Sequence, residues 1–458
     1  MRTGAEVLLE VLASEGVRHV FGNPGTTELP FMDTLAGRDD LRYVLGLQEA
    51  AVVGLADGYA QATGRPAFLN LHTAAGLGNA VGNLTNARAN TTPLVVTAGQ
   101  QDRRHLVADP LLSGDLTGLA RGVSKWSHEV RTLGELGTIL RRAFRDAAAP
   151  PTGPVFVSMP MDILDEAGEV PVPDRSTVDH RRTPPPDAVD ALCRLLVEVA
   201  PGRLAIVAGD EVSVSGGVEA LVATAETLGA PVYGSPLHGT TVFPTVHPLW
   251  RGPLHPMAAK VRETLADADR VLLVGGQAFL AYPYTPGPPL PDGTELLHVS
   301  SDPAQPGHTW PTRLGLVGDP RETLEALLRR LQVDPPAEAA AALAQARERR
   351  EAMALRAEEH AEGAYAADPM HAEAAVHALL RALPDDTPVV DEAVTAGSYI
   401  RRLQRSDAPG RYFFCRGGGL GWGMPAAAGV SLGLDRKPVL CVVGDGSAMY
   451  SPRNWSGG

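Results

Sequence analysis

The sequence predicts an α/β protein made of three consecutive open parallel-sheet domains. Short β-branched strand patterns alternate with amphipathic helix patterns along the whole chain, and proline-rich breaks interrupt this alternation. Repeated βα units place their strands in one parallel sheet with helices on both faces. We expect domains at residues 1–172, 187–335 and 366–458.

The composition narrows the class of protein. A chain of 458 residues is too long for one ordinary core, and its net charge of −13 with no basic run argues against nucleic-acid or membrane-surface partners. No apolar segment is long enough to span a bilayer, and residues 1–16 predict an amphipathic helix and not a signal peptide. Three cysteines without metal-ligand spacing (Cys193, Cys415 and Cys441) indicate core thiols in a reducing compartment. We therefore expect a cytoplasmic enzyme.

The first domain is predicted from its strands and the helices between them. Strands are expected at 17–21, 67–71, 94–98 and 154–158, with one more ending near Leu47. Helices are expected at 49–63 and 74–88, and the turn 22–28 is expected to cap a helix through Thr26.

Prolines between 171 and 186 mark a linker to the second domain. In that domain the sequence predicts helices at 187–199 and 215–228 and strands at 204–208, 271–274 and 297–300. Residues 337–363, rich in Ala, Glu and Arg, predict a solvated helix between domains. The third domain predicts a strand at 388–391, a glycine-rich loop at 416–423 and a fully buried strand at 439–443.

The last of these strands leads into the sequence Gly444-Asp445-Gly446-Ser447. Glycines allow a tight turn and close approach of a ligand to the backbone. Ligands of open α/β sheets bind at the carboxyl ends of the strands. A carboxylate and a hydroxyl presented there suit a hard divalent cation that holds phosphates.

Glu49 and His72 are the side chains on which acid–base chemistry would depend. Glu49 begins an apolar helix, so it is either a carboxylate favoured by the helix N-terminus or a proton carrier whose pKa is raised by an apolar pocket. His72 follows the strand 67–71 at the edge where ligands bind, although a satisfied structural histidine is an equal alternative. The run 417–423 partly matches a dinucleotide fingerprint, but no clear strand enters it and no acid follows at the required spacing.

Six ordered segments of the chain together resemble the thiamine diphosphate-dependent enzymes, and among them the benzoylformate decarboxylase group. They are FGNPGTTELPF (21–31), LQEAAVVGLADGYAQATGRPAFLNLHTAAGLGNAVGNL (47–84), PLVVTAGQQ (93–101), FPTVHPLWRG (243–252), YFFCRGGGLGWGMPAAAGV (412–430) and VVGDGSAMYS (442–451). The resemblance implies a pyrimidine-binding domain, a central domain and a diphosphate-binding domain, in that order. It also implies thiamine diphosphate and Mg²⁺ as cofactors.

The resemblance assigns roles to individual residues. Glu49 is similar to the glutamate that protonates the aminopyrimidine ring, His72 to an active-site histidine that transfers protons, and Thr26 to a serine that contacts the substrate carboxylate. Asp445 is similar to the metal ligand of the Gly-Asp-Gly motif. The other residues expected to bind the cofactor are Thr395, Gly418, Gly419, Leu420, Gly444, Gly446 and Ser447.

The activity implied is non-oxidative decarboxylation of a 2-oxo acid, giving an aldehyde and carbon dioxide. The resemblance further implies a homodimer or homotetramer whose sites are shared between subunits, with Glu49 of one chain facing Asp445 of another. The sequence departs from the group at Tyr282, where a second histidine is expected. It also stops at Gly458, before the Asn-Asn pair that completes the metal site in the family.

Two alternatives remain beside the decarboxylase. One is a carboligase of the acetolactate synthase type, which shares the fold and Glu49. The other is an inactive, C-terminally truncated member of the family, because one metal carboxylate without its partner should bind the cation weakly. Thiamine diphosphate titration would separate the second alternative from the other two.

Overall fold

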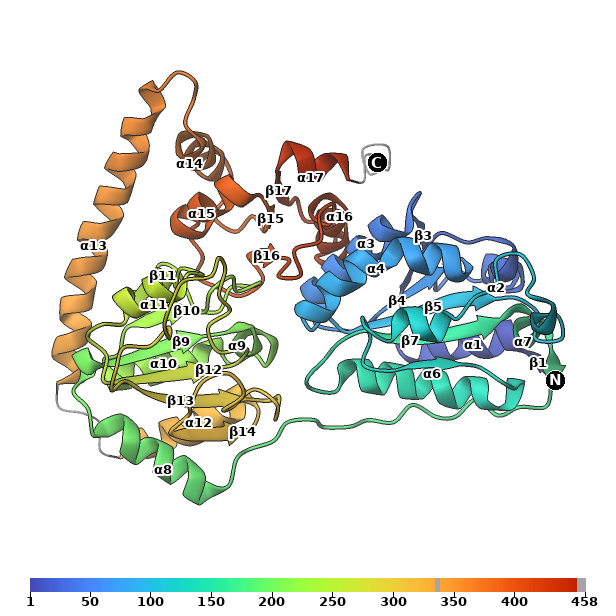
Figure 1. Ribbon diagram of the computed structural model, residues 1–458, viewed down its shortest axis with the longest axis horizontal. Helices are drawn as coiled ribbons and strands as arrows, with labels where there is room; N and C mark the ends of the chain where they lie inside the picture. The colour runs from blue at the N-terminus through green and yellow to red at the C-terminus, as the bar shows by residue number, and fades with distance from the viewer. Residues whose placement is uncertain (334–337, 451–458) are drawn as a thin grey trace. The chain divides into compact units, whose positions relative to one another are not determined.

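The computed structural model describes residues 1–333 and 338–450 (Figure 1). Contacts divide these residues into two compact units. The N-terminal unit contains Met1–Asp179, Val389–Ala393 and the chain from Cys415 onward, and the central unit contains His180–Pro388 and Val394–Phe414. No helix among the described residues is both long and apolar enough to cross a membrane.

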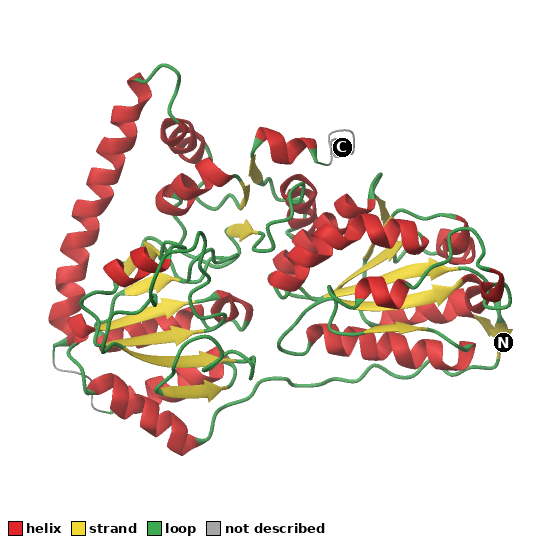
Figure 2. Ribbon diagram, in the orientation of Figure 1, coloured by secondary structure: helices red, strands yellow, loops and turns green. Residues whose placement is uncertain are grey.

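A six-stranded sheet in the order β3-β2-β4-β5-β7-β6 forms the centre of the N-terminal unit, and every neighbouring pair in it is parallel. Helices cover both faces of this sheet (Figure 2). The strands are β2 (His19–Gly22), β3 (Arg42–Leu45), β4 (Ala67–Leu71), β5 (Leu94–Gln100), β6 (Ser127–Glu129) and β7 (Val155–Pro160). The helices are α1 (Gly4–Ser14), α2 (Leu29–Ala36), α3 (Glu49–Thr63), α4 (Thr73–Ala89), α5 (Leu116–Ala120), α6 (Leu133–Ala148) and α7 (Met161–Asp165).

Consecutive strand residues in this sheet enter opposite cores. Val20 packs with α1 and α6, whereas its neighbour Phe21 packs with α3 and α4. Phe68 and Leu69 of β4 divide between the two cores in the same way. Successive side chains of a strand point to opposite faces, so a strand covered on both sides is apolar at most of its positions. This is why β4 and β5 contain apolar runs.

The N-terminal unit also contains a short antiparallel pair and part of the third predicted domain. The antiparallel strands are β1 (Arg2–Thr3) and β8 (Ala167–Gly168). From the third domain come the parallel strands β15 (Val389–Glu392) and β17 (Leu440–Val443), with the helices α16 (Gly423–Gly433) and α17 (Asp445–Met449). The strand predicted at 439–443 is parallel as expected, but it is half-buried and not fully buried. It lies at the end of its sheet among the described residues, so only one edge is paired.

Helices α3 and α16 cross at small residues. A Cβ atom on Gly58 would lie 2.2 Å from the Ala426 carbonyl oxygen, and one on Gly429 would lie 2.0 Å from that of Leu55. Backbone therefore packs on backbone at this crossing, which only glycine permits. Helix α3 in this way supports the segment that follows the glycine-rich loop.

The central unit has its own parallel sheet in the order β11-β10-β9-β12-β13-β14. The strands of this sheet are β9 (Leu204–Ala208), β10 (Val232–Gly234), β11 (Trp250–Pro253), β12 (Arg270–Val274), β13 (Glu295–Ser300) and β14 (Leu314–Val317). The strand β16 (Tyr412–Phe414) also belongs to this unit but is not part of this sheet. Its helices are α8 (Pro186–Val197), α9 (Asp210–Val214), α10 (Val218–Leu228), α11 (Ala258–Thr264), α12 (Pro320–Leu331), α13 (Ala339–Gly363), α14 (Ala372–Ala382) and α15 (Val394–Leu403).

Two predictions for the central unit differ from the structure. The helix expected at 215–228 begins three residues later, as α10 at Val218, because Gly216 adopts a φ of +71° before it; α9, which ends at Val214, was not predicted. The pattern also missed β10, β11 and β14, which are three or four residues long. Strands this short show too little alternation to be distinguished from loops.

Candidate active site

Glu49 lies in the first turn of α3 and is 8% exposed. Gln48 caps this helix by accepting a hydrogen bond from the Ala51 N–H. The Glu49 carboxylate lies between two amides: Asn23 donates to Oε1 at 3.0 Å and Asn79 donates to Oε2 at 3.1 Å. Of the two alternatives for Glu49, these surroundings differ from the apolar pocket, because both oxygens have polar partners. Asn79 belongs to the second turn of α4, so this carboxylate connects the start of α3 with α4.

His72 follows β4 and occupies the N-cap position of α4. Its Nδ1 lies 2.8 Å from Glu28 Oε2 and 3.2 Å from Thr27 Oγ1. Thr27 and Glu28 are buried in the short 3₁₀ turn Thr26–Glu28, at the carboxyl end of β2. The strand-end position predicted for His72 is confirmed, and the contacts place it beside this turn.

Thr26 is exposed and does not cap a helix, contrary to the prediction. Gly25 is the N-cap of the 3₁₀ turn, and its N–H donates to Glu28 Oε2 at 2.8 Å. Sequence reasoning missed Thr27 and Glu28, as well as the two asparagines that bind Glu49. A Glu three residues after the N-cap is the signal that could have found Glu28, because that spacing is typical of a capping box.

The glycine-rich loop is held by three side chains of the same unit. Asn86 of α4 accepts from the Gly419 N–H and donates to its carbonyl, both at 2.9 Å. Glu392 accepts from the N–H groups of Gly421 and Gly423 at 2.6 and 2.5 Å. Asp57 of α3 accepts from Trp422 Nε1 at 2.7 Å. Burial raises the pKa of both carboxyl groups above the usual values.

The exposed part of this loop contains the residues expected to contact a cofactor. Gly418 has a φ of +73° and faces open space, since a Cβ atom placed on it would have nothing within 4 Å. Leu420 is 41% exposed although its neighbours Gly421 and Trp422 are buried. The anchored loop thus presents backbone and one bulky apolar side chain to solvent.

Asp445 begins α17 directly after β17, at the carboxyl end of that strand as predicted. Its carboxylate is exposed, and its Oδ1 accepts from the Gly446 N–H at 2.8 Å. The hydroxyl residue Ser447 is buried in the same turn. Within residues 1–333 and 338–450, no group of three or more His, Cys, Asp or Glu side chains could hold a metal ion. Thr395 lies in the first turn of α15, which belongs to the central unit, and is exposed.

These residues fit the cofactor that the resemblance implies. An exposed carboxylate at a strand end is a suitable oxygen ligand for Mg²⁺, and the unobstructed Gly418 and Gly446 leave room for a diphosphate. A Cβ on Gly76 would lie 3.2 Å from Glu49 Oε1, so this glycine leaves space beside that carboxylate.

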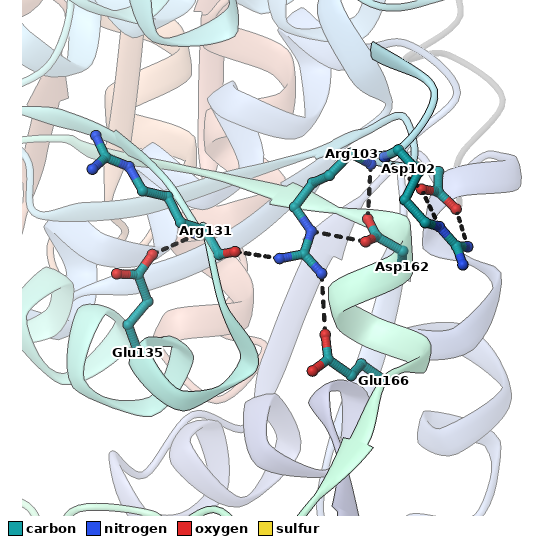
Figure 3. Close-up of polar contacts among 7 residues, drawn as sticks. Asp102, Arg103, Arg131, Glu135, Asp162 and Glu166 are labelled. Carbon is teal, nitrogen blue, oxygen red and sulfur yellow. Dashed lines mark hydrogen bonds and ion pairs between the residues drawn. The ribbon is translucent and has the colours of Figure 1, made fainter. Parts of the chain in front are cut away.

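A second group of charged residues lies at the carboxyl ends of β5 and β7, around a depression of about 580 Å³ (Figure 3). Arg103 pairs with Asp162 at 2.8 Å and with Glu166 at 3.1 Å, and it also donates to the carbonyl of Arg131. Arg104 pairs with Asp102. The charges of this depression are largely satisfied by one another, which indicates a structural network.

Family models match the chain in three consecutive segments. The thiamine pyrophosphate enzyme N-terminal binding domain matches residues 2–119, the central domain matches 190–327, and the C-terminal binding domain matches 395–455. The order is the one expected for the three predicted domains, whose boundaries remain predictions.

Individual relatives agree with these matches. Benzoylformate decarboxylase of Pseudomonas aeruginosa is 37% identical over 98% of this chain and 82% of its own length. The large subunit of acetolactate synthase isozyme 3 from Escherichia coli is 29% identical over 98% of this chain and 78% of its own.

Solved structures give the same result. Benzoylformate decarboxylase from Polynucleobacter necessarius superposes with a TM-score of 0.87 at 31% identity, covering 100% of this chain and 83% of that one. The thiamine diphosphate-dependent 4-hydroxybenzoylformate decarboxylase of Rhodococcus jostii superposes with a TM-score of 0.86 at 31% identity and the same coverage. The chain belongs to the thiamine pyrophosphate enzyme family.

Proposed function

We propose that this protein is a thiamine diphosphate- and Mg²⁺-dependent decarboxylase that converts a 2-oxo acid to an aldehyde and carbon dioxide. The observation that carries the proposal is the pairing of two acid–base groups around one helix. Glu49 accepts a hydrogen bond from Asn79 of α4, and His72 occupies the N-cap of the same helix. A carboxylate and an imidazole held this way can serve separate proton transfers.

Some of these residues would bind the cofactor and the metal ion, and others would transfer protons or bind the substrate. Bound thiamine diphosphate would supply the electron sink for the carbon–carbon bond cleavage. Asp445 would hold the metal ion, with Gly418, Gly419 and Ser447 at the diphosphate and Leu420 against the rings. Glu49 would exchange a proton with the aminopyrimidine, His72 would give or take one near the substrate, and Thr26 would donate a hydrogen bond to the substrate carboxylate.

The direct test is turnover of 2-oxo acids by the purified protein with thiamine diphosphate and Mg²⁺. We expect release of carbon dioxide and aldehyde from benzoylformate or a related 2-oxo acid. Glu49→Gln should lower kcat/KM about 10²- to 10⁴-fold, because it removes one acid–base group. Glu10→Gln, at an exposed glutamate paired with Arg2, should leave activity unchanged. Absence of turnover with every 2-oxo acid would contradict the proposal.

A carboligase of the acetolactate synthase type is the second candidate, favoured by the similarity to the Escherichia coli enzyme over 98% of this chain. Product analysis separates the two functions. A decarboxylase accumulates the aldehyde, whereas a carboligase incubated with a second 2-oxo acid accumulates a larger hydroxyketone product. Accumulation of that product as the main species would select the carboligase.

We also propose that two chains share each active site, with Glu49 of one chain facing Asp445 of the other. Support comes from Leu29, Leu45 and Leu47, which are 60%, 59% and 48% exposed although they lie close in sequence to Thr26 and Glu49. Exposed apolar side chains near a site are typical of surfaces that a partner covers.

Subunit complementation tests this arrangement. Glu49→Gln and Asp445→Ala proteins should each be inactive. After dissociation and equal mixing, half of the dimers contain one chain of each kind, and each of these has one intact site. Activity should then return to about a quarter of the wild-type value. No recovery, although mixed dimers form, would place both residues of each site in one chain.

A further inference from the structure

The imidazole of His72 is bound through one nitrogen only. Nδ1 lies 2.8 Å from Glu28 Oε2 and 3.2 Å from Thr27 Oγ1. Nε2 has no hydrogen-bond partner among the residues that the structure describes. The side chain is 22% exposed, whereas that of Glu28 is fully buried. The two ring nitrogens therefore have different environments, and Nε2 is the one open to a ligand.

The hydrogen bonds of Glu28 determine which ring nitrogen of His72 carries the proton. Glu28 Oε2 accepts from the Gly25 N–H at 2.8 Å, and Oε1 accepts from the Thr27 hydroxyl at 2.7 Å. Both oxygens of this carboxylate therefore act as hydrogen-bond acceptors. The short contact to His72 then requires a proton on Nδ1. In the neutral imidazole, Nε2 is left with the lone pair.

Two glycines make space for this pair. A Cβ on Gly25 would lie 2.3 Å from Nδ1 and Cε1 of His72, so the ring packs directly on that backbone. A Cβ on Gly99 of β5 would lie 2.0 Å from Glu28 Oε1 and 2.2 Å from Thr27 Oγ1. Ring and carboxylate are therefore confined by main chain, which cannot move aside as a flexible side chain could.

The peptide after His72 is strained. Thr73 has a φ of +55°, a conformation that β-branched residues rarely adopt, and its hydroxyl is buried without a hydrogen-bond partner among the described residues. Such strain persists only where the surrounding structure imposes it. Here the surrounding structure includes the turn that holds the ring.

We propose that Glu28 is a positioning residue for His72. Its carboxylate holds the imidazole in the Nδ1–H tautomer and fixes the ring plane, so that Nε2 is the atom that receives or returns a proton on the ligand side. The role of Nε2 in turnover rests on the proposed decarboxylase function. The tautomer itself does not depend on it.

Nitrogen NMR of protein labelled with ¹⁵N-histidine tests the tautomer without activity. The His72 signals are those that disappear in His72→Gln. At a pH where the imidazole is neutral, the wild-type protein should show a protonated Nδ1 and an unprotonated Nε2. Glu28→Gln should shift the population toward the Nε2–H form. A wild-type His72 in the Nε2–H form, or a tautomer unchanged in a folded Glu28→Gln protein, would overturn the proposal.

Kinetics provide the second measurement. Glu28→Gln should lower kcat by up to about 10²-fold with a smaller change in KM, because ground-state binding does not need the tautomer. Glu15→Gln, which breaks a carboxylate–Arg141 pair outside the hydrogen-bond network of His72, should leave kcat unchanged. If no 2-oxo acid is turned over but the tautomer shift is seen, the decarboxylase proposal fails and the positioning role stands.

Discussion

Glu392 shows how one buried carboxylate can fix a loop. It is 7% exposed and accepts hydrogen bonds from two backbone N–H groups of the glycine-rich loop. Backbone donors at Gly421 and Gly423 would otherwise be buried without partners, which costs more than the bonds themselves contribute. A loop rich in glycine is flexible in isolation, so its single conformation depends on such acceptors.

Replacing this carboxylate should destabilise the protein. Glu392→Gln keeps one acceptor oxygen but turns an NH2 donor toward the other N–H group, and we expect the free energy of unfolding to fall by about 1–3 kcal/mol. Urea denaturation measures the change. Glu263→Gln, at an exposed glutamate paired with Lys260, is the control and should leave the free energy nearly unchanged. An unchanged midpoint for Glu392→Gln would show that the loop does not need this acceptor.

The wild-type protein and Glu392→Gln should also differ in how their free energies of unfolding depend on pH. Burial raises the pKa of Glu392 in the folded protein, so the folded state binds this proton more tightly than the unfolded state. The stability contributed by protonation is complete below the unfolded pKa and is lost as pH rises through the folded pKa. The stability advantage of wild type over Glu392→Gln should therefore shrink as pH rises from about 4. An advantage that grows with pH would contradict this.

At the scale of elements, the crossing of α3 and α16 restricts which residues can occupy two helical positions. Gly58→Ala and Gly429→Ala each push a methyl group against a carbonyl oxygen of the other helix. We expect each substitution to destabilise by about 1–3 kcal/mol through overpacking. Gly78→Ala, in α4 with nothing within 4 Å, should instead stabilise by up to about 1 kcal/mol, because alanine favours helix. Thermal or urea unfolding checks all three, and equal effects would rule out a close crossing.

Elements with a strong pattern could be predicted from the sequence. The helix at 49–63 and the strands at 67–71 and 204–208 have the predicted bounds, because each is a run of mostly small or apolar residues between clear breaks. The half-burial of β17 could not be predicted, since a fully apolar strand has the same sequence whether or not a neighbour covers it.

The candidate site was predictable where a residue type and a strand end coincide, as at His72 and Asp445. It was not predictable where the partner comes from elsewhere in the chain. Asn79 and Glu28 reach Glu49 and His72 across sequence separations of 30 and 44 residues. Only the parallel sheet brings these positions together, because it gathers the carboxyl ends of its strands.

For the whole molecule, cofactor binding should raise the free energy of unfolding. A ligand bound only by the folded state at 100 times its Kd adds about 2.7 kcal/mol to the free energy of unfolding. Thiamine diphosphate with Mg²⁺ should therefore raise the melting temperature in a concentration-dependent way, and Asp445→Ala should weaken this response. Asp102→Ala, in the separate charged depression, should keep it. A melting temperature unaffected by the cofactor at any Mg²⁺ concentration would favour the inactive alternative.

Helix α3 bears on how this enzyme could be redesigned. Glu49 begins the helix, and Gly58, roughly 13 Å further along its axis, supports α16. A helix is stiff over that length, so whatever displaces α16 also displaces the carboxylate. Laboratory evolution toward new substrates should accordingly find its beneficial changes at exposed positions outside the crossing, such as Thr26 and Leu420. Libraries that randomise the helical crossing would mostly sample proteins in which Glu49 and the glycine-rich loop have both been displaced.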